Sequence, residues 1–161
     1  MAEDKEHGDV SIKEYPEEQL NAQPLGYWSG EGYRRVVGRI RADLAVEGLT
    51  QPHWWTLNHV AGAPGLWSRS TLTAKLRPFD DLGIDLDDVF LDLIDRGWLK
   101  EDGGTLTLTE TGEAGRRRAW DRSAQAQEVM RDGITTADYV TTINVLRRVI
   151  GNLGGESDLP G

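Results

Sequence analysis

The sequence of 161 residues contains no cysteine, which excludes disulfides, thiolate catalysis and zinc sites built on thiolates. It also lacks any run approaching the roughly 18 apolar residues that a membrane-spanning helix needs, and its acidic start is unlike a signal peptide. We therefore expect a cytoplasmic protein with no membrane partner. The length suits one domain with a buried core.

Basic residues are outnumbered, because 18 lysines and arginines face 27 aspartates and glutamates, a net charge of −9. Affinity for nucleic acid comes from lysine and arginine, so the average charge argues against a nucleic-acid binder. The distribution is uneven, however. Residues 48–79 contain no acid, whereas residues 80–102 contain nine acids against two basic residues. Residues 1–24 carry seven acids against two lysines without apolar periodicity, which predicts a mobile acidic arm.

Candidate catalytic and metal-binding groups are sparse. His53 and His59 are six positions apart, which places them on different faces of a helix and excludes a metal pair. The sequence shows no glycine-rich phosphate loop and no Ser-His-acid order. We therefore expect no catalytic residue, no metal and no cofactor. The aspartate doublets at 80–81 and 87–88 could hold a cation, but a solvated acidic surface is the commoner explanation.

Apolar residues recur at helical spacing in the first half of the chain. Residues 27–46 carry the stripe Tyr33, Val37, Ile40 and Leu44, and Gly48 ends this helix. A second helix is predicted from its N-cap, Thr50, to residue 62, with Trp54, Leu57 and Ala61 on its core side.

Two further helices are predicted before residue 97. The third begins at Arg69 and breaks near Pro78, and the fourth is capped by Asp85 and ends at Gly97. The buried stripe of the fourth helix is Leu86, Val89, Phe90, Leu93 and Ile94.

The periodicity changes after Gly97. Residues 98–100 and 105–108 predict a hairpin around a polar, glycine-containing turn. Thr109 then caps a fifth helix that reaches Asp132, and a sixth begins near Thr135. The apolar seam of the sixth helix follows a coiled-coil spacing: Tyr139, Ile143, Leu146, Ile150 and Leu153.

Three short helices followed by a hairpin, with long helices on both sides, resemble the MarR-type regulators over residues 25–155. Four stretches carry the resemblance: residues 48–54 (GLTQPHW), 93–99 (LIDRGWL), 106–112 (LTLTETG) and 145–153 (VLRRVIGNL). It implies a mainly α fold with a small β-hairpin wing. A winged helix-turn-helix lobe at about 49–109 would lie between dimerisation helices at about 27–46 and 110–153, with the arm 1–24 and a tail 156–161 outside.

The resemblance also implies a homodimer that places two lobes in successive major grooves of a pseudo-palindromic operator, and that a small, often aromatic ligand releases. The first and sixth helices support a dimer on physical grounds. An isolated amphipathic helix of about twenty residues is marginal in water, and the lobe has only one face to cover two apolar stripes. A monomer that buries both stripes internally is the alternative.

The fourth helix departs from a DNA reader in its charge. Opposite its apolar stripe it offers Asp87, Asp88, Leu91, Asp92 and Asp95. Phosphates repel carboxylates, and among the bases only the cytosine amino group favours them. We therefore expect double-stranded DNA to be contacted mainly through the third helix and the wing, by Ser68, Arg69, Ser70, Thr71, Lys75, Arg77 and Lys100. The arginines at 116–118 could contact phosphate or bridge to acids of the other lobe.

Six tryptophans are many for this length. Trp54 and Trp98 suit packing, whereas Trp55 shares a helical face with Asn58 and His59 and forms an aromatic wall with a polar handle. Trp28 and Trp120, from the first and fifth helices, could join this wall around a flat aromatic ligand. Alternatively, these aromatics fill the joint between the lobe and the long helices.

The sequence is therefore compatible with three functions. The first is a ligand-responsive, DNA-binding transcriptional regulator. The second is a binding module of the same fold that has lost base reading, which the acidic fourth helix favours. The third is an enzyme that uses His59 or His53 as an acid/base in the aromatic cleft, for which only the tryptophans and a histidine argue.

Overall fold

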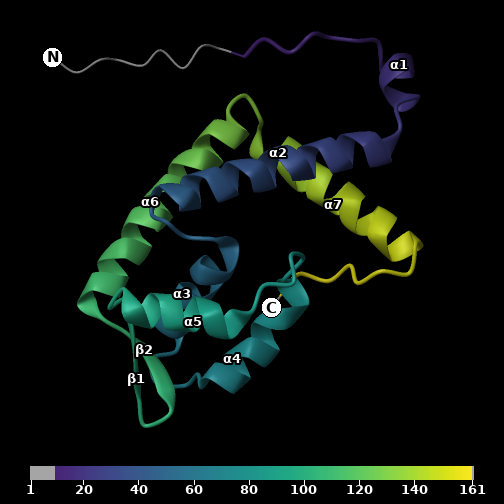
Figure 1. Ribbon diagram of the computed structural model, residues 1–161. Helices are drawn as coiled ribbons and strands as arrows, with labels where there is room; N and C mark the ends of the chain where they lie inside the picture. Colours follow the sequence, from purple (N-terminus) through teal and green to yellow (C-terminus); the bar gives the residue numbers. More distant parts are fainter. Residues whose placement is uncertain (1–9, 161) are drawn as a thin grey trace, which may run out of the picture. The chain divides into compact units, whose positions relative to one another are not determined.

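The computed structural model describes residues 10–160 (Figure 1). They form two compact units, one up to Arg35 and one from Val36 onward, and helix α2 (Leu25–Val46) crosses the boundary. The first nine residues of the predicted acidic arm lie outside the described residues. Within residues 10–160, no helix combines the length and apolarity needed to cross a membrane.

The N-terminal unit contains a helix that the sequence did not predict. Helix α1 (Glu17–Asn21) is a single turn after Pro16, and none of its residues is buried. In the first half of α2, Glu31 forms ion pairs with Arg34 at 2.8 Å and Arg35 at 2.7 Å. These i,i+3 and i,i+4 pairs stabilise the exposed helix locally.

The larger unit begins with the predicted helices at the predicted positions. Helix α3 (Gln51–Gly62) follows Thr50, and α4 (Arg69–Leu76) leads into a short 3-10 helix, η1 (Arg77–Phe79), that contains Pro78. Helix α5 (Leu86–Asp95) begins after Asp85, whose carboxylate accepts the Asp87 N–H at 3.0 Å. The break at the proline and both caps are therefore confirmed.

The hairpin pairs β1 (Leu99–Asp102) with β2 (Thr105–Leu108) in antiparallel register, with Leu99 opposite Leu108. Gly103 and Gly104 form its turn at φ of 58° and 82°, a region that suits glycine. Strand β2 also forms a backbone hydrogen bond outside the hairpin that the sequence did not predict: the Leu106 N–H donates to the Trp67 carbonyl at 2.8 Å. This bond attaches the hairpin to the chain just before α4.

The core lies between α3, α4, α5 and the hairpin. Four residues of the predicted α5 stripe, Leu86, Val89, Phe90 and Leu93, are buried, whereas the fifth, Ile94, is half-buried at the edge of the core. On α3 the buried face differs in part from the prediction, because the helix contacts α5, α6 and β2 together. It buries Thr56 and Val60 beside Leu57, whereas Trp54 lies half-buried at the edge of the core.

Two long helices complete the chain, α6 (Glu110–Arg131) and α7 (Thr136–Asn152). Helix α6 buries only small residues, namely Gly112, Gly115, Ala119 and Ala126. Helix α7 buries none, and its predicted seam remains accessible along the single chain, with Ile143, Ile150 and Leu153 all exposed. The mainly α winged helix-turn-helix fold is thus confirmed.

Trp98 explains why α6 begins with glycines. This residue is 9% exposed, and its ring lies against the first turns of α6. A Cβ atom on Gly112 would overlap the Trp98 carbonyl, and one on Gly115 would overlap the indole ring. The guanidinium groups of Arg96 and Arg118 lie 5.9 and 6.0 Å from the ring.

We therefore expect Gly115→Ala to lower the free energy of unfolding by about 1–3 kcal/mol, because the methyl group must displace a packed indole. Gly62→Ala is the matched control, since a Cβ at the end of α3 meets no atom within 4 Å. Urea unfolding of the two variants measures the difference. Equal stabilities would show that Trp98 does not lie against α6 in this way.

Candidate DNA-binding surface and ligand pockets

The start of α4 brings together four of the predicted DNA-contacting residues. Ser68 and Thr71 form a reciprocal capping box, in which each hydroxyl accepts the backbone N–H of the other residue, at 3.2 and 3.0 Å. The Ser70 hydroxyl lies 3.0 Å from that of Ser68. Arg69 pairs with Glu101 on β1 at 2.7 Å. This ion pair joins α4 to the wing and offsets part of the charge that Arg69 would offer to phosphate.

The other three predicted contacts are exposed cations. Lys75 lies in the last turn of α4, Arg77 begins η1 and Lys100 extends from β1. None of them forms an ion pair with another residue in the described range, 10–160. Their charges are therefore available to an external phosphate group.

The exposed face of α5 is acidic, as the sequence indicates. Asp87, Asp88 and Asp95 are exposed, and Leu91 between them is 43% exposed. Asp92 departs from the expected pattern. Its carboxylate accepts a hydrogen bond from His53 Nε2 at 2.9 Å and pairs with Arg96 at 2.7 Å. Asp92 is thus engaged within the chain, and fewer carboxylates face outward than the sequence predicts.

His53 connects the start of α3 to α5. Its Nδ1 accepts the Thr50 backbone N–H at 3.2 Å and lies 2.7 Å from the Thr50 hydroxyl. A backbone N–H only donates, so Nδ1 is unprotonated and the Nε2 proton is the one given to Asp92. The network extends through Arg96, which donates to the Gly48 carbonyl at 2.9 Å. A histidine three residues after the cap Thr50 was the signal that the sequence offered for this role.

Burial lowers the pKa of His53 below its ordinary value, because the buried ring is harder to charge. The hydrogen bond and the negative charge of Asp92 oppose this shift without cancelling it. The ring is therefore neutral near pH 7, which agrees with its hydrogen-bonding pattern.

The arginine run at 116–118 forms ion pairs with acids of its own chain. Arg116 pairs with Glu113 at 2.7 Å and donates to the Asn58 side-chain oxygen at 3.1 Å. The Arg116 guanidinium is the main reason that the pKa of Glu113 falls to about 2. Arg117 also pairs with Glu113, and Arg118 pairs with Glu47 at 2.9 Å. These arginines join α6 to α3 and to the end of α2.

The predicted aromatic wall is only partly assembled. The Trp55 ring meets the Phe79 ring edge-on, with centroids 6.4 Å apart, and His59 Nδ1 donates to the Trp55 carbonyl at 2.8 Å. Trp120 instead lies 6.2 Å from Trp54. Neighbouring residues of an α-helix point about 100° apart, so the partners of positions 54 and 55 differ. The prediction that Trp120 meets Trp55 is therefore wrong.

The other predicted ligand residues each contact partners that the sequence did not indicate. Trp28 belongs to the N-terminal unit, where its ring meets that of Tyr27 edge-on at 5.2 Å. Asn58 donates to the Trp54 carbonyl at 2.9 Å and accepts from Arg116, so its amide is satisfied within the chain. The His59 ring lies 5.8 Å from that of Trp67, which the sequence did not associate with it.

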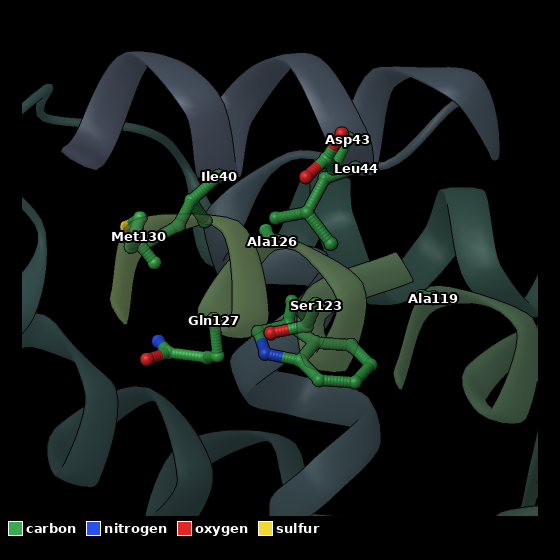
Figure 2. Close-up of a pocket in the computed structure, with 9 residues that line it drawn as sticks. Ile40, Asp43, Leu44, Ala119, Ser123, Ala126, Gln127 and Met130 are labelled. Carbon is green, nitrogen blue, oxygen red and sulfur yellow. The ribbon is translucent and has the colours of Figure 1, made fainter. Parts of the chain in front are cut away.

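Two pockets border α3. The first is a narrow space of about 10 Å³ between α2, α3 and α6, room for about one water molecule (Figure 2). Figure 2 shows Ile40 and Leu44 above it and Ser123 and Gln127 from α6 beside it. The second has about 210 Å³ and lies between α2, the start of α3 and residues 80–84. Trp55 lines this second pocket, whereas Asn58, His59 and Trp120 line neither.

Within residues 10–160, no three histidine, aspartate or glutamate side chains are arranged so that they could hold a metal ion. Of the first aspartate doublet, Asp80 accepts the backbone N–H groups of Leu82 and Ile84 at 3.1 and 2.6 Å. Its carboxylate therefore stabilises the loop before α5.

Helices α3, α4 and α5 followed by the hairpin define a winged helix-turn-helix protein. Neither a protein-family model nor a curated protein matches the chain. Solved structures do match, and they show the MarR-type fold. The PcaV transcriptional regulator from Streptomyces coelicolor, solved with its natural ligand, is 25% identical, with 80% of this chain and 95% of that chain covered and a TM-score of 0.57.

Two further solved structures are similar. A MarR family protein of Mycobacterium tuberculosis in complex with DNA is 23% identical over 79% of this chain and 98% of that chain, with a TM-score of 0.62. A MarR family transcriptional regulator from Silicibacter pomeroyi is 16% identical over 86% of this chain and 99% of that chain, with a TM-score of 0.63.

The lowered pKa of His53 predicts a pH dependence of stability. In the unfolded chain the imidazole has its ordinary pKa of about 6.5. As the pH falls below this value, the unfolded state takes up a proton that the folded state resists, so stability decreases. We expect wild-type protein to lose more stability between pH 7.5 and 5.5 than His53→Asn, measured by urea unfolding. Parallel pH profiles would contradict a buried, neutral His53.

Proposed function

We propose that this protein is a ligand-responsive transcriptional regulator that binds double-stranded DNA. The observation that carries the proposal is a complete winged helix-turn-helix lobe, in which α4, η1 and the wing present Lys75, Arg77 and Lys100, none of which has an ion partner among residues 10–160. The likeness to a MarR family protein solved on DNA, and to PcaV solved with its ligand, supports both halves of the proposal.

The proposed active form is a homodimer on a pseudo-palindromic operator. Helix α7 supports it, because a helix of 17 residues with a regular apolar seam and no buried residue is poorly stable alone. A second copy that contributes the same helices would cover the seam on both chains. One lobe from each chain would then reach successive major grooves.

The charge pattern indicates how DNA would be contacted. Lys75, Arg77 and Lys100 would bind phosphates, which gives affinity but little sequence information. On α5, Asp87 and Asp88 can accept hydrogen bonds in the major groove only from the amino groups of bases, and the cytosine amino group is the usual partner of a carboxylate there. We therefore propose that base contacts are few and that DNA shape contributes much of any preference.

We also propose that the protein is not an enzyme. The two histidines weighed as acid/base groups both serve the fold, since His53 bridges Thr50 and Asp92 and His59 is bound to the Trp55 carbonyl. Neither lines the two pockets that border α3.

A second candidate function is a binding module of the same fold that no longer reads DNA. The specific observation in its favour is the exposed face of α5, where Leu91 lies among Asp87, Asp88 and Asp95. A basic partner would suit this face better than a phosphate backbone does.

Fluorescence anisotropy with the DNA upstream of the protein's own gene separates the two candidates. A regulator should bind this duplex more tightly than a scrambled duplex of equal length at the same salt concentration. Equal and weak binding of both duplexes would favour the binding module.

Charge variants test the proposed contacts. Lys75→Ala and Arg77→Ala should each weaken binding to all sequences and reduce the slope of log K against log salt by about 1. The double variant Asp87→Asn/Asp88→Asn should strengthen binding to scrambled DNA, because it removes repulsion of phosphates. Arg148→Ala, on exposed α7 outside the lobe, is the charge-matched control. Loss of binding in the aspartate variant would instead assign base reading to those carboxylates.

The dimer is tested by sedimentation velocity at micromolar concentration. Leu146→Glu places a charge in the α7 seam and should cost on the order of 3–5 kcal/mol of association free energy, because the ion would be buried without a partner. Thr141→Glu, exposed on the same helix and outside the seam, is the control and should remain dimeric. A monomeric wild-type protein would exclude the proposed assembly.

A further inference from the structure

A polar pocket of about 490 Å³ lies between the second half of α7 and the segment that follows this helix. Its volume is within the range of roughly 300–1,000 Å³ that small-molecule sites have. Neither an acidic nor an apolar side chain belongs to its lining, in contrast to the two pockets that border α3. The lining consists of Asn144, Arg147, Arg148, Gly151, Asn152 and Ser157. A polar ligand suits such a lining.

The chain turns back after α7 and forms the second side of the pocket (Figure 1). The Gly155 N–H donates to the Ile150 carbonyl at 2.9 Å, and the Gly154 N–H donates to the Gly151 carbonyl at 3.0 Å. This pair of bonds ends a helix at a residue with positive φ, and Gly154 has a φ of 81°. The bonds satisfy two of the carbonyls at the end of α7 and reverse the direction of the chain.

Two contacts hold the segment after α7 beside the helix. Arg147 Nε donates to the Ser157 carbonyl at 2.7 Å. Gly151 lies opposite Ser157, where an added Cβ atom would be 3.3 Å from Ser157 Oγ, closer than a Cβ atom ordinarily comes to another atom. Glycine at this position therefore lets the segment approach α7. The pocket is thus formed by specific contacts within the chain.

Two positive charges line the pocket. Arg147 donates through Nη1 to the Asn144 side-chain oxygen at 3.1 Å, and its Nη2 group has no partner among residues 10–160. Arg148 forms no hydrogen bond or ion pair with any residue in the same range. A guanidinium group donates hydrogen bonds and accepts none, so both side chains offer donors to an external anion.

The negative groups near the pocket do not neutralise these charges. Glu156 and Asp158 flank Ser157 in the sequence, but both are exposed, and neither lines the pocket or pairs with an arginine. One Glu156 oxygen accepts the Asp158 N–H at 3.0 Å. The C-terminal end of a helix is equivalent to about half a negative charge, which is less than the charge of two guanidinium groups. The direct contacts of a ligand in this pocket therefore favour an anion.

The pocket and the apolar seam lie on different sides of α7. Successive residues of an α-helix point about 100° apart, so Arg148 and Gly151 lie about 160° and 140° around the helix from Leu146 of the seam. Contact between the seam and a second copy of the chain therefore does not require the pocket residues. A ligand site here is compatible with the proposed dimer and does not depend on it.

We propose that this pocket binds a phosphorylated small polar molecule, with its phosphate on Arg147 and Arg148 and its uncharged part beside Asn144 and Asn152. The planar guanidinium group matches the oxygens of a phosphate, and two such groups balance the charge of about −2 on a phosphate monoester at neutral pH. The two asparagine amides can donate to hydroxyl groups of the ligand. The site lies outside the winged helix-turn-helix lobe and does not rest on the proposed function.

Isothermal titration calorimetry of the full chain without DNA tests the site, in phosphate-free buffer at constant ionic strength. The probes are ribose 5-phosphate, ribose and inorganic phosphate. We expect ribose 5-phosphate to bind at least about tenfold more tightly than ribose, because only the phosphate forms charge-assisted hydrogen bonds with the arginines. Equal binding of these two probes, or no binding of ribose 5-phosphate, would overturn the proposal. Inorganic phosphate should bind more weakly than ribose 5-phosphate, and equal affinities would overturn the contacts assigned to the asparagines.

A charge variant locates the binding. Arg148→Gln should weaken ribose 5-phosphate by at least about tenfold and retain the fold, since the side chain is exposed and unpaired among residues 10–160. Arg117→Gln removes an exposed guanidinium from α6 and is the matched control, which should bind as wild type does. The same affinity in wild type and Arg148→Gln would contradict the proposed site.

A second variant distinguishes a formed pocket from two surface arginines. Gly151→Val fills the space toward Ser157 Oγ and leaves the net charge unchanged. We expect it to weaken ribose 5-phosphate by about tenfold, whereas Gly62→Val, where a Cβ meets no atom within 4 Å, should bind as wild type does. Unchanged affinity of Gly151→Val would overturn the pocket. If that variant does not fold, Arg148→Gln still decides. Because no DNA is present, these results are independent of whether the protein is a regulator.

Discussion

Burial of one face of α3 positions α4, α5 and the two pockets that border α3. Leu57 and Val60 on this face are almost completely inaccessible to solvent, and α3 contacts α4, α5, α6 and β2. The apolar stripe of α5 packs into the same core, where α5 contacts α3, α4 and β1, and this packing determines which face of α5 is exposed. Trp54 and Trp55 flank this face, and for that reason one borders the narrow pocket beside α6 and the other the wider pocket before α5.

Ion pairs within the chain neutralise many of its charges, so the net charge does not describe the surface that a partner meets. Four acidic residues of the larger unit form ion pairs with arginines. Two of these pairs lie within one helix, Asp92 with Arg96 and Glu113 with Arg116, and two join separate elements, Glu101 with Arg69 and Glu47 with Arg118. These pairs remove arginines as well as acids from the surface charge that a partner would encounter. Among the charges of the lobe that lie outside these pairs are Asp87, Asp88 and Asp95 on α5 and the cations Lys75, Arg77 and Lys100. A chain with a net charge of −9 can therefore still present a basic edge.

The sequence predicted those features that depend on near neighbours. Caps at Thr50, Asp85 and Thr109, the break at Pro78 and the α5 stripe all follow from residues within one or two turns, and the structure confirms them. The site was less predictable, because its contacts join distant positions. His53 and Asp92 are 39 residues apart, and no local pattern reveals that a helix places one against the other. The partners of Trp55 and Trp120 likewise depend on which helices contact each side of α3.

The hydrogen bond from the Leu106 N–H to the Trp67 carbonyl has a consequence for how this fold tolerates change. Both atoms belong to the backbone, so among substitutions at the two positions only proline at 106 removes a partner from the bond. The distance between the wing and the start of α4 therefore does not depend on which side chains surround this bond. An exchange of acidic for basic residues on the outer face of the lobe therefore leaves this bond intact, so the surface charge can change while the wing stays attached to the chain before α4.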